Sequence, residues 1–192
     1  MPDPNQAALD FLLARRSLPA KTFVAPVPTR AALEVILTAA LRVPDHGKLE
    51  PWRLVVLERP ALQRLADLAV ARARELGADE QTTAKGRGQY DAGQLAVAVI
   101  SSPKASDKVP LSEQILSSGA LCMGLVTAAT AAGWGACWLT GWPAHDAVFA
   151  SRAFGCTDAE TVAGLVHIAT PTVALPDRPR PDLSRIVTWV PA

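Results

Sequence analysis

The chain has 192 residues, 49% of them hydrophobic and 19% charged, so it can bury a core and is not globally disordered. Its formal net charge of +1 leaves too few excess basic residues for a nucleic-acid binder. Three widely spaced cysteines argue against a disulfide framework or a zinc site, and they favour a cytoplasmic protein.

The first predicted element is an amphipathic helix over residues 5–14, which ends at the cluster Arg15-Arg16-Ser17. Three prolines between residues 19 and 28 predict an extended connector. Thr29 is a suitable N-cap for a second helix, which must stop before Pro44. A polar loop then leads into a strand predicted at residues 52–58.

In the middle of the chain, Pro60 favours the start of a third helix and Gly77 its end. Residues 78–93 are polar and contain several glycines, which predicts only a weak helix or a mobile surface segment. Residues 95–100 form a continuous apolar run, which is typical of a strand covered on both faces.

Residues 114–144 contain no charged side chain, a stretch long enough to cross a membrane. Serine, threonine and glycine dilute its hydrophobicity, so we expect a buried helix over 110–132 and a buried strand over 135–140. A helix over 144–154, a strand over 161–169, a proline-rich tail and a last strand over 186–190 follow. Such mixed elements predict an α+β or α/β sandwich.

Two motifs together resemble the FMN-binding framework of the nitroreductase family, in its short NAD(P)H nitroreductase-like branch. One is Arg15-Arg16-Ser17, and the other runs from Leu41 to Arg53 through Pro44-Asp45-His46. The resemblance implies an α+β fold with a mixed central β-sheet sandwiched by helices. It also implies a homodimer in which the C-terminal segment is exchanged, and a single nitroreductase-like FMN-binding domain over residues 1–192.

The resemblance places the FMN phosphate at Arg15, Arg16 and Ser17. Guanidinium groups hold a phosphate by charge-assisted hydrogen bonds, and a serine hydroxyl adds another donor. The alternative is that two arginines simply lie at the C-terminus of a helix, where their charge is favourable without any ligand.

The resemblance also places Arg42 and His46 at the flavin that the partner subunit mainly binds. Alternatively, Arg42 pairs with Asp45 and His46 caps the preceding helix. Trp138, Leu139 and Thr140 end a strand and are expected beside the isoalloxazine ring. The alternative there is that they are ordinary core residues of the strand.

Three residues depart from the family pattern: Lys48, Glu50 and Leu139. Related sequences commonly have a neutral hydrogen-bonding residue at the first position, glutamine at the second and a polar residue at the third. Glu50 is open to a salt bridge with Lys48 or Arg53, or to an effect on the charge near the flavin. These departures weaken any transfer of substrate preference.

The resemblance predicts an FMN-dependent oxidoreductase that uses NAD(P)H to reduce nitroaromatic, quinone or related conjugated acceptors by a ping-pong hydride mechanism. No side chain needs to be a nucleophile and no metal is expected, while His46 is a possible proton donor. The alternatives are a non-catalytic flavin-binding or redox-sensing module, or dehydrogenation, dehalogenation or flavin fragmentation. The expected partners are a small-molecule acceptor and a second copy of the chain, with neither nucleic acid nor a membrane.

Overall fold

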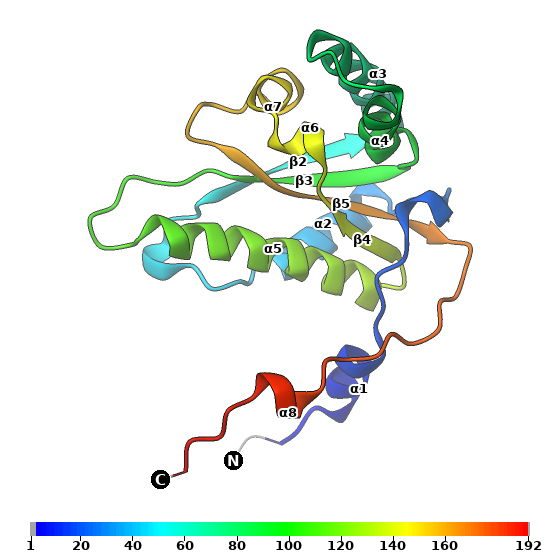
Figure 1. The fold of residues 1–192 in the computed structure, drawn as a ribbon. Coiled ribbons are helices and arrows are strands. Elements are labelled where there is room, and N and C mark those ends of the chain that lie inside the picture. The colour runs from blue at the N-terminus through cyan, green and yellow to red at the C-terminus, as the bar shows by residue number, and fades with distance from the viewer. Residues whose placement is uncertain (1–2, 192) are drawn as a thin grey trace.

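The computed structural model describes residues 3–191, and its centre is a five-stranded antiparallel sheet (Figure 1). The strands in chain order are β1 (Phe23–Val24), β2 (Trp52–Glu58), β3 (Leu95–Ser101), β4 (Gly135–Leu139) and β5 (Thr161–Pro171). β5 pairs with β3 and with β4, β3 pairs with β2, and β1 pairs with the C-terminal end of β5. β2 therefore ends one side of the sheet.

Helices cover both faces of this sheet (Figure 1). One face carries α2 (Arg30–Ala40) and α5 (Leu111–Ala131), and the other carries α3 (Arg59–Glu75), α4 (Glu80–Asp91), α6 (Trp142–His145) and α7 (Ala147–Phe154). Every residue of β3 is buried, as its continuous apolar run predicts. Alternate β3 residues enter different cores: Ala98 packs with α3 and α7, and Val99 packs with α2 and α5.

The predicted α+β class and the helix-covered sheet are confirmed. The sheet differs in one respect, because the four strand pairings among residues 3–191 are all antiparallel rather than mixed. Residues 186–190 were expected to form a last strand, yet they leave a short helix, α8 (Leu183–Ile186), and continue without regular structure. An isolated extended segment has no neighbour to complete its backbone hydrogen bonds, so this prediction is wrong for the single chain.

The long helix α5 is held close to α2 by a glycine. A Cβ atom on Gly124 would lie 2.8 Å from the carbonyl oxygen of Ala40, so only glycine permits this approach. By length and composition α5 also qualifies as a membrane span. In the fold, residues such as Leu121, Leu125 and Ala129 are fully buried against the sheet and α2, as expected of a core helix.

Within residues 78–93 the structure has a regular helix, α4 (Glu80–Asp91), where the sequence predicted a weak helix or a mobile segment. Asp79 caps α4 by accepting a hydrogen bond from Thr82 N at 2.6 Å. Gly86 is needed there, because its missing side chain leaves room for the indole of Trp142, whose Nε1 donates to Thr82 O at 2.9 Å. Tertiary packing thus stabilises a segment with little helical signal of its own.

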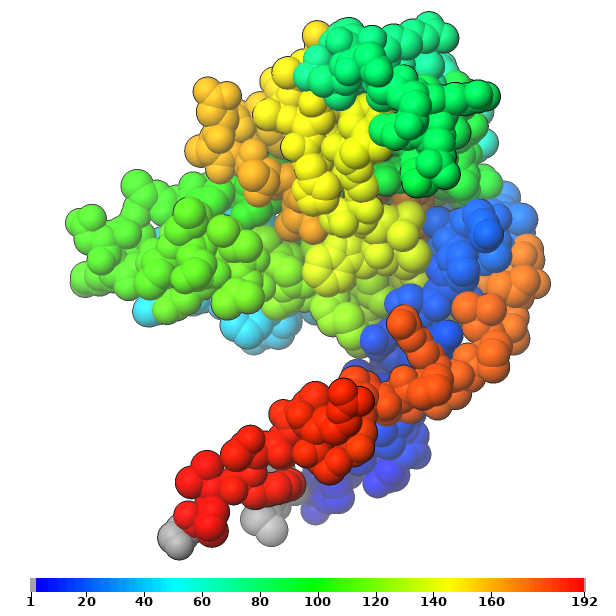
Figure 2. Space-filling model, in the orientation of Figure 1, coloured from blue at the N-terminus to red at the C-terminus, as the bar shows by residue number. Residues whose placement is uncertain are grey.

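An arm extends from the body of the molecule (Figure 2). It consists of α1 (Gln6–Ala14) and the tail after β5, and the two are joined where Arg180 donates to the carbonyl of Leu13. No residue of α1 is buried, and α8 has none either. The arm therefore exposes the apolar side chains Leu9, Leu12, Leu13, Leu183, Ile186, Trp189 and Val190.

Candidate functional site

The segment Arg15–Ser17 lies between α1 and β4. The backbone N–H of Leu18 donates to Ala136 O at 3.2 Å, which fixes the end of this segment against β4. Arg15 reaches α5, with Nη2 3.9 Å from the sulfur of Met123. The Nε of Arg16 is buried and has no hydrogen-bond partner among residues 3–191. A buried guanidinium N–H without a partner is costly to the fold.

Trp138 lies at the end of β4, near this segment. Its Nε1 donates to Ala163 O at 3.3 Å, and its indole crosses β5 at Gly164, where a Cβ would lie 2.0 Å from Nε1. The side chain is 41% exposed, so part of the ring is open to a ligand. Thr140 is exposed, whereas Leu139 packs partly into the core around Phe23.

The loop between α2 and β2 is fixed by its own polar groups. The carboxylate of Asp45 accepts from Leu49 N at 3.1 Å and from Glu50 N at 2.9 Å. The loop turns sharply, with positive φ at Gly47, Lys48 and Glu50, so Asp45 stabilises an otherwise unfavourable backbone. Asp45 is thus used within the loop, and the alternative that it pairs with Arg42 is wrong.

Within this loop His46 is exposed and points to α5 rather than capping α2. Its Nδ1 lies 2.7 Å from Oε2 of Glu113, in the first turn of α5. Both residues line a cavity of about 350 Å³, together with Pro44, Leu116, Ser117 and Ala120. Arg42 is exposed two residues before Pro44. Sequence reasoning missed Glu113, because it lies 67 residues from His46 and belongs to no motif.

The predicted site residues form two groups in the single chain. Arg15, Arg16, Ser17 and Trp138 to Thr140 gather near β4, and Arg42 and His46 lie at the other loop. Among the described residues, no hydrogen bond or ion pair joins the groups. The two groups lie at different sides of α5. His46 meets the side formed by Glu113, Ser117 and Ala120, which are spaced i, i+4, i+7, whereas Arg15 and Trp138 meet the side of Met123 and Gly119.

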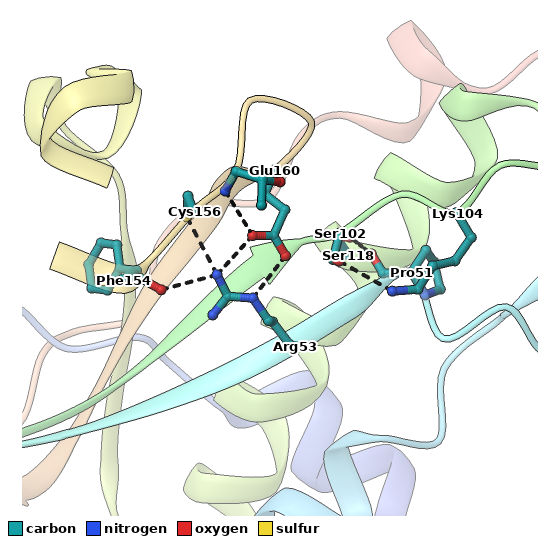
Figure 3. Close-up of polar contacts among 9 residues, drawn as sticks. Pro51, Arg53, Ser102, Lys104, Ser118, Phe154, Cys156 and Glu160 are labelled. Carbon is teal, nitrogen blue, oxygen red and sulfur yellow. Dashed lines mark hydrogen bonds and ion pairs between the residues drawn. The ribbon is translucent and has the colours of Figure 1, made fainter. Parts of the chain in front are cut away.

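Arg53 does not pair with Glu50 but anchors β2 to the start of β5 (Figure 3). Its Nε and Nη2 bind the two carboxylate oxygens of Glu160 at 2.8 and 2.9 Å, and Nη2 also donates to Phe154 O at 3.1 Å. The bonds from Arg53 lower the pKa of Glu160 to about 2, against the opposing effect of its burial. Nη2 is 3.8 Å from the Cys156 sulfur, where burial raises the thiol pKa, so this cysteine is not an activated nucleophile.

The family follows from comparison with known proteins. The model of the nitroreductase family matches residues 12–170. The chain belongs to the nitroreductase family. It is 32% identical over 164 residues to the putative NAD(P)H nitroreductase YdjA of Escherichia coli K12, covering 85% of this chain and 88% of that protein. It is 36% identical over 165 residues to a putative NAD(P)H nitroreductase of Haemophilus influenzae, with the same coverage of each.

Solved structures of the nitroreductase family share the fold at lower identity. A nitroreductase-like protein from Bacillus cereus matches with a TM-score of 0.77 at 17% identity, over 99% of each chain. A nitroreductase with bound FMN from Bacteroides fragilis matches with a TM-score of 0.71 at 19% identity, over 95% of this chain and 98% of that one. The family model and the two curated relatives confirm the sequence-based assignment to an oxidoreductase of the nitroreductase family, and the solved structures confirm its fold.

Proposed function

We propose that this nitroreductase is an FMN-dependent enzyme that uses NAD(P)H to reduce nitroaromatic, quinone or related conjugated acceptors. The observation that carries the proposal is the Nε of Arg16, which is buried without a partner among the described residues. A phosphate oxygen supplies the acceptor that this donor lacks. The FMN in the Bacteroides fragilis structure is a property of that protein, and it supports the same cofactor here.

Each group of residues has a distinct role in this proposal. Arg15, Arg16 and Ser17 hold the phosphate, and the exposed part of Trp138 packs beside the ring system with Leu139 and Thr140. Arg42 and His46 come from the partner subunit. An arginine can donate hydrogen bonds to a flavin carbonyl or phosphate oxygen, and a histidine ring nitrogen can form a hydrogen bond with a polar atom at the edge of a bound molecule.

FMN, when bound, supplies the redox chemistry, which is to take a hydride from NAD(P)H and return it to the acceptor. The chain's residues hold the cofactor, exclude water and position the two substrates in turn at one place. One shared binding place means that the oxidised nicotinamide leaves before the acceptor enters, which is a ping-pong order. His46 is the proposed source of a proton for the acceptor.

The proposal requires a homodimer, and the exposed apolar surfaces support one. Helix α1 exposes Leu9, Leu12 and Leu13, each by about half, and α5 exposes Ile115 and Leu116 by 50% and 72%. Figure 2 shows open space between the arm and the surface of α5. A second copy placed there covers both apolar surfaces, as obligate dimers do.

The exchanged C-terminal segment also has a suitable binding place on a second copy. A groove of about 720 Å³ lies between α2 and the edge strand β2. Its lining combines apolar side chains, such as Leu33 and Val56, with charged ones, such as Arg30, Glu34 and Arg59. The tail exposes Trp189 and Val190, each by 87%. We place the partner's tail in this groove, next to the unpaired side of β2, because an uncovered edge strand and an exposed tryptophan are both liabilities.

The proposal also includes a cytoplasmic location, with a small-molecule acceptor and neither nucleic acid nor a membrane as partner. Cys122, Cys137 and Cys156 are all free and buried, which fits a reducing compartment. The small net charge gives no electrostatic basis for nucleic-acid binding.

The test of function starts from the absorption spectrum of the purified protein reconstituted with FMN. We expect the visible absorption band of flavin to stay with the protein during sedimentation. After denaturation, FMN should appear in the supernatant. NADH and NADPH are then tried as reductants with a quinone and a nitroaromatic compound. Parallel double-reciprocal plots at several acceptor concentrations are the expected ping-pong signature.

Two outcomes contradict the proposal in different ways. Failure to bind FMN in a fluorescence titration removes the cofactor assignment altogether. Tight binding of FMN without NAD(P)H oxidation for any acceptor makes the chain a non-catalytic flavin-binding module instead.

A further inference from the structure

A carboxylate and an imidazole meet at the cavity beside α5. Nδ1 of His46 is 2.7 Å from Oε2 of Glu113, which is a short contact for this pair of atoms. The side chains are 59% and 48% exposed, so an ordinary ion pair at this place contributes less than about 1 kcal/mol to folding. The contact therefore contributes little to stability, and its main effect is on the imidazole of His46.

Both sides of the contact are mounted on fixed backbone. On the His46 side, Asp45 holds the loop, and Ser117 Oγ donates to Pro44 O at 2.6 Å. On the Glu113 side, the buried Gln114 accepts from Lys104 N at 2.8 Å and donates to Lys104 O at 3.1 Å. These bonds fix the start of α5, so the imidazole and the carboxylate approach from two preorganised elements.

The chemistry of the two groups sets where the proton lies. An ionised carboxylate only accepts hydrogen bonds, so Nδ1 of His46 must carry a proton when it contacts Glu113. In the neutral ring Nε2 is then the unprotonated nitrogen. In the charged ring Nε2 carries a proton that it can donate, and loss of this proton yields directly the neutral form that Glu113 stabilises.

We infer that Glu113 is a positioning residue for His46, which fixes the neutral imidazole with its proton on Nδ1 and keeps Nε2 as the nitrogen that serves the acceptor. This inference rests on the proposed function for the acceptor itself, and NAD(P)H supplies the electrons as proposed there. The proton that leaves Nε2 goes to the reduced acceptor, and solvent returns a proton to Nε2 before the next cycle.

The first test does not depend on activity or on bound cofactor. Nitrogen-15 NMR of histidine-labelled protein at alkaline pH distinguishes a ring protonated at Nδ1 from one protonated at Nε2, and a His46→Asn variant assigns the signals. We expect the wild type and Glu113→Gln to show the Nδ1–H form, because glutamine keeps an acceptor oxygen. Glu113→Ala should shift to the Nε2–H form that free imidazole side chains prefer.

The second test measures turnover in the holoenzyme. At saturating NAD(P)H, Glu113→Ala should lower kcat with a quinone roughly tenfold or more, since general acid catalysis is worth at least that much. Affinity for FMN should fall far less than kcat, because His46 itself is still present, and Glu113→Gln should restore most of kcat. Asp67→Ala is the matched control. It also removes an exposed carboxylate from an ion pair, in this case with Arg87, and it should behave as wild type.

An Nε2–H ring in the wild type, or the same tautomer in wild type and Glu113→Ala, overturns the inference. A shifted tautomer with unchanged kcat also overturns it, because Glu113 then has no part in turnover. If the wild type binds no FMN or turns over no acceptor, the proposed function fails, and the NMR result still decides whether Glu113 sets the tautomer.

Discussion

Among single residues, Arg16 carries the largest consequence, because its buried Nε has no partner among the described residues. Replacing both Arg15 and Arg16 by alanine removes charge-assisted bonds worth about 1.5–3 kcal/mol each. We therefore expect FMN affinity to fall at least about a hundredfold in a flavin fluorescence titration, while the circular dichroism spectrum stays that of the wild type. Arg74→Ala, at an exposed position of α3, should leave affinity unchanged. Equal affinity in all three proteins contradicts the phosphate assignment.

His167 gives the protein a predictable dependence on pH. The residue is 1% exposed, and burial lowers its pKa to about 4, against a smaller opposing effect of the Gln89 backbone. In the unfolded chain a histidine takes up a proton near pH 6.5, whereas in the folded chain His167 stays neutral down to about pH 4. The contribution of neutral His167 to the unfolding free energy is therefore fully present above pH 6.5 and is lost as the pH falls toward 4. Between pH 7.5 and pH 5 the loss from this residue is about 2 kcal/mol.

Urea unfolding at pH 7.5 and pH 5 measures this loss. His167→Leu removes the titrating group, so its unfolding free energy should fall less over this range than that of the wild type. His145→Leu, at an exposed histidine, should keep the full dependence. If His167→Leu shows the same pH dependence as the wild type, protonation of His167 does not differ between the folded and unfolded chain, and the prediction is wrong.

The residues of the site were only partly predictable. Arg15, Arg16 and Ser17 form a local motif, so the sequence suffices to single them out. The partners of His46 and Arg53 are instead Glu113 and Glu160, which lie 67 and 107 residues away. Such contacts depend on how strands and helices are arranged, and no local spacing encodes them.

Among the elements, the contact between α2 and α5 depends on a glycine. A Cβ at position 124 would lie 2.8 Å from Ala40 O, so Gly124→Ala forces the two helices apart and should cost about 1–3 kcal/mol. Gly88 lies in α4 with no atom within 4 Å of its Cβ position, so Gly88→Ala should instead stabilise by roughly 0.5–1 kcal/mol. Thermal and urea unfolding of both variants test the contrast. Stabilisation by both substitutions would show that helix propensity, and not the close approach of α2 to α5, decides the effect at position 124.

The elements themselves could be predicted wherever a periodic pattern coincided with a cap or a stop. Thr29 begins α2, and Gly155 ends α7 in a left-handed conformation. α4 was underestimated because its helix depends on Asp79 as a cap and on the packing of Gly86 against Trp142. Side chains from different elements made that helix stable, and a window of sequence does not contain them.

The whole molecule has surfaces that a single chain leaves uncovered. We expect Trp189→Glu to shift the protein from dimer to monomer in light scattering at low micromolar concentration and to release FMN. The change removes the indole that is proposed to cover the apolar part of the groove beside β2, around Leu33 and Val56. Thr188→Glu is the matched control, since neighbouring residues of an extended segment point to opposite sides. A wild-type protein that is monomeric with FMN bound contradicts the exchange of the tail.

The proposed dimer would also account for the separation of the two sequence motifs within one chain. The prediction of a single FMN-binding domain over residues 1–192 stays a prediction, and so does the assignment of Arg42 and His46 to the partner's flavin. The structure separates these residues from Arg15 and Arg16 onto different sides of α5. The arrangement of two copies is beyond the reach of sequence patterns, because it depends on surfaces that only the complete fold creates.

The most direct test of the shared site is a mixed dimer, made by co-expressing two differently tagged subunits. One subunit carries Arg15→Ala and Arg16→Ala, and the other carries Arg42→Ala and His46→Ala. If each flavin lies across the interface, one site keeps all four residues and the other loses them all. The titration should then show half the FMN per dimer binding with wild-type affinity, although each variant homodimer binds weakly. Two weakened sites, with neither binding FMN at wild-type affinity, would place all four residues in one subunit's pocket and contradict the shared site.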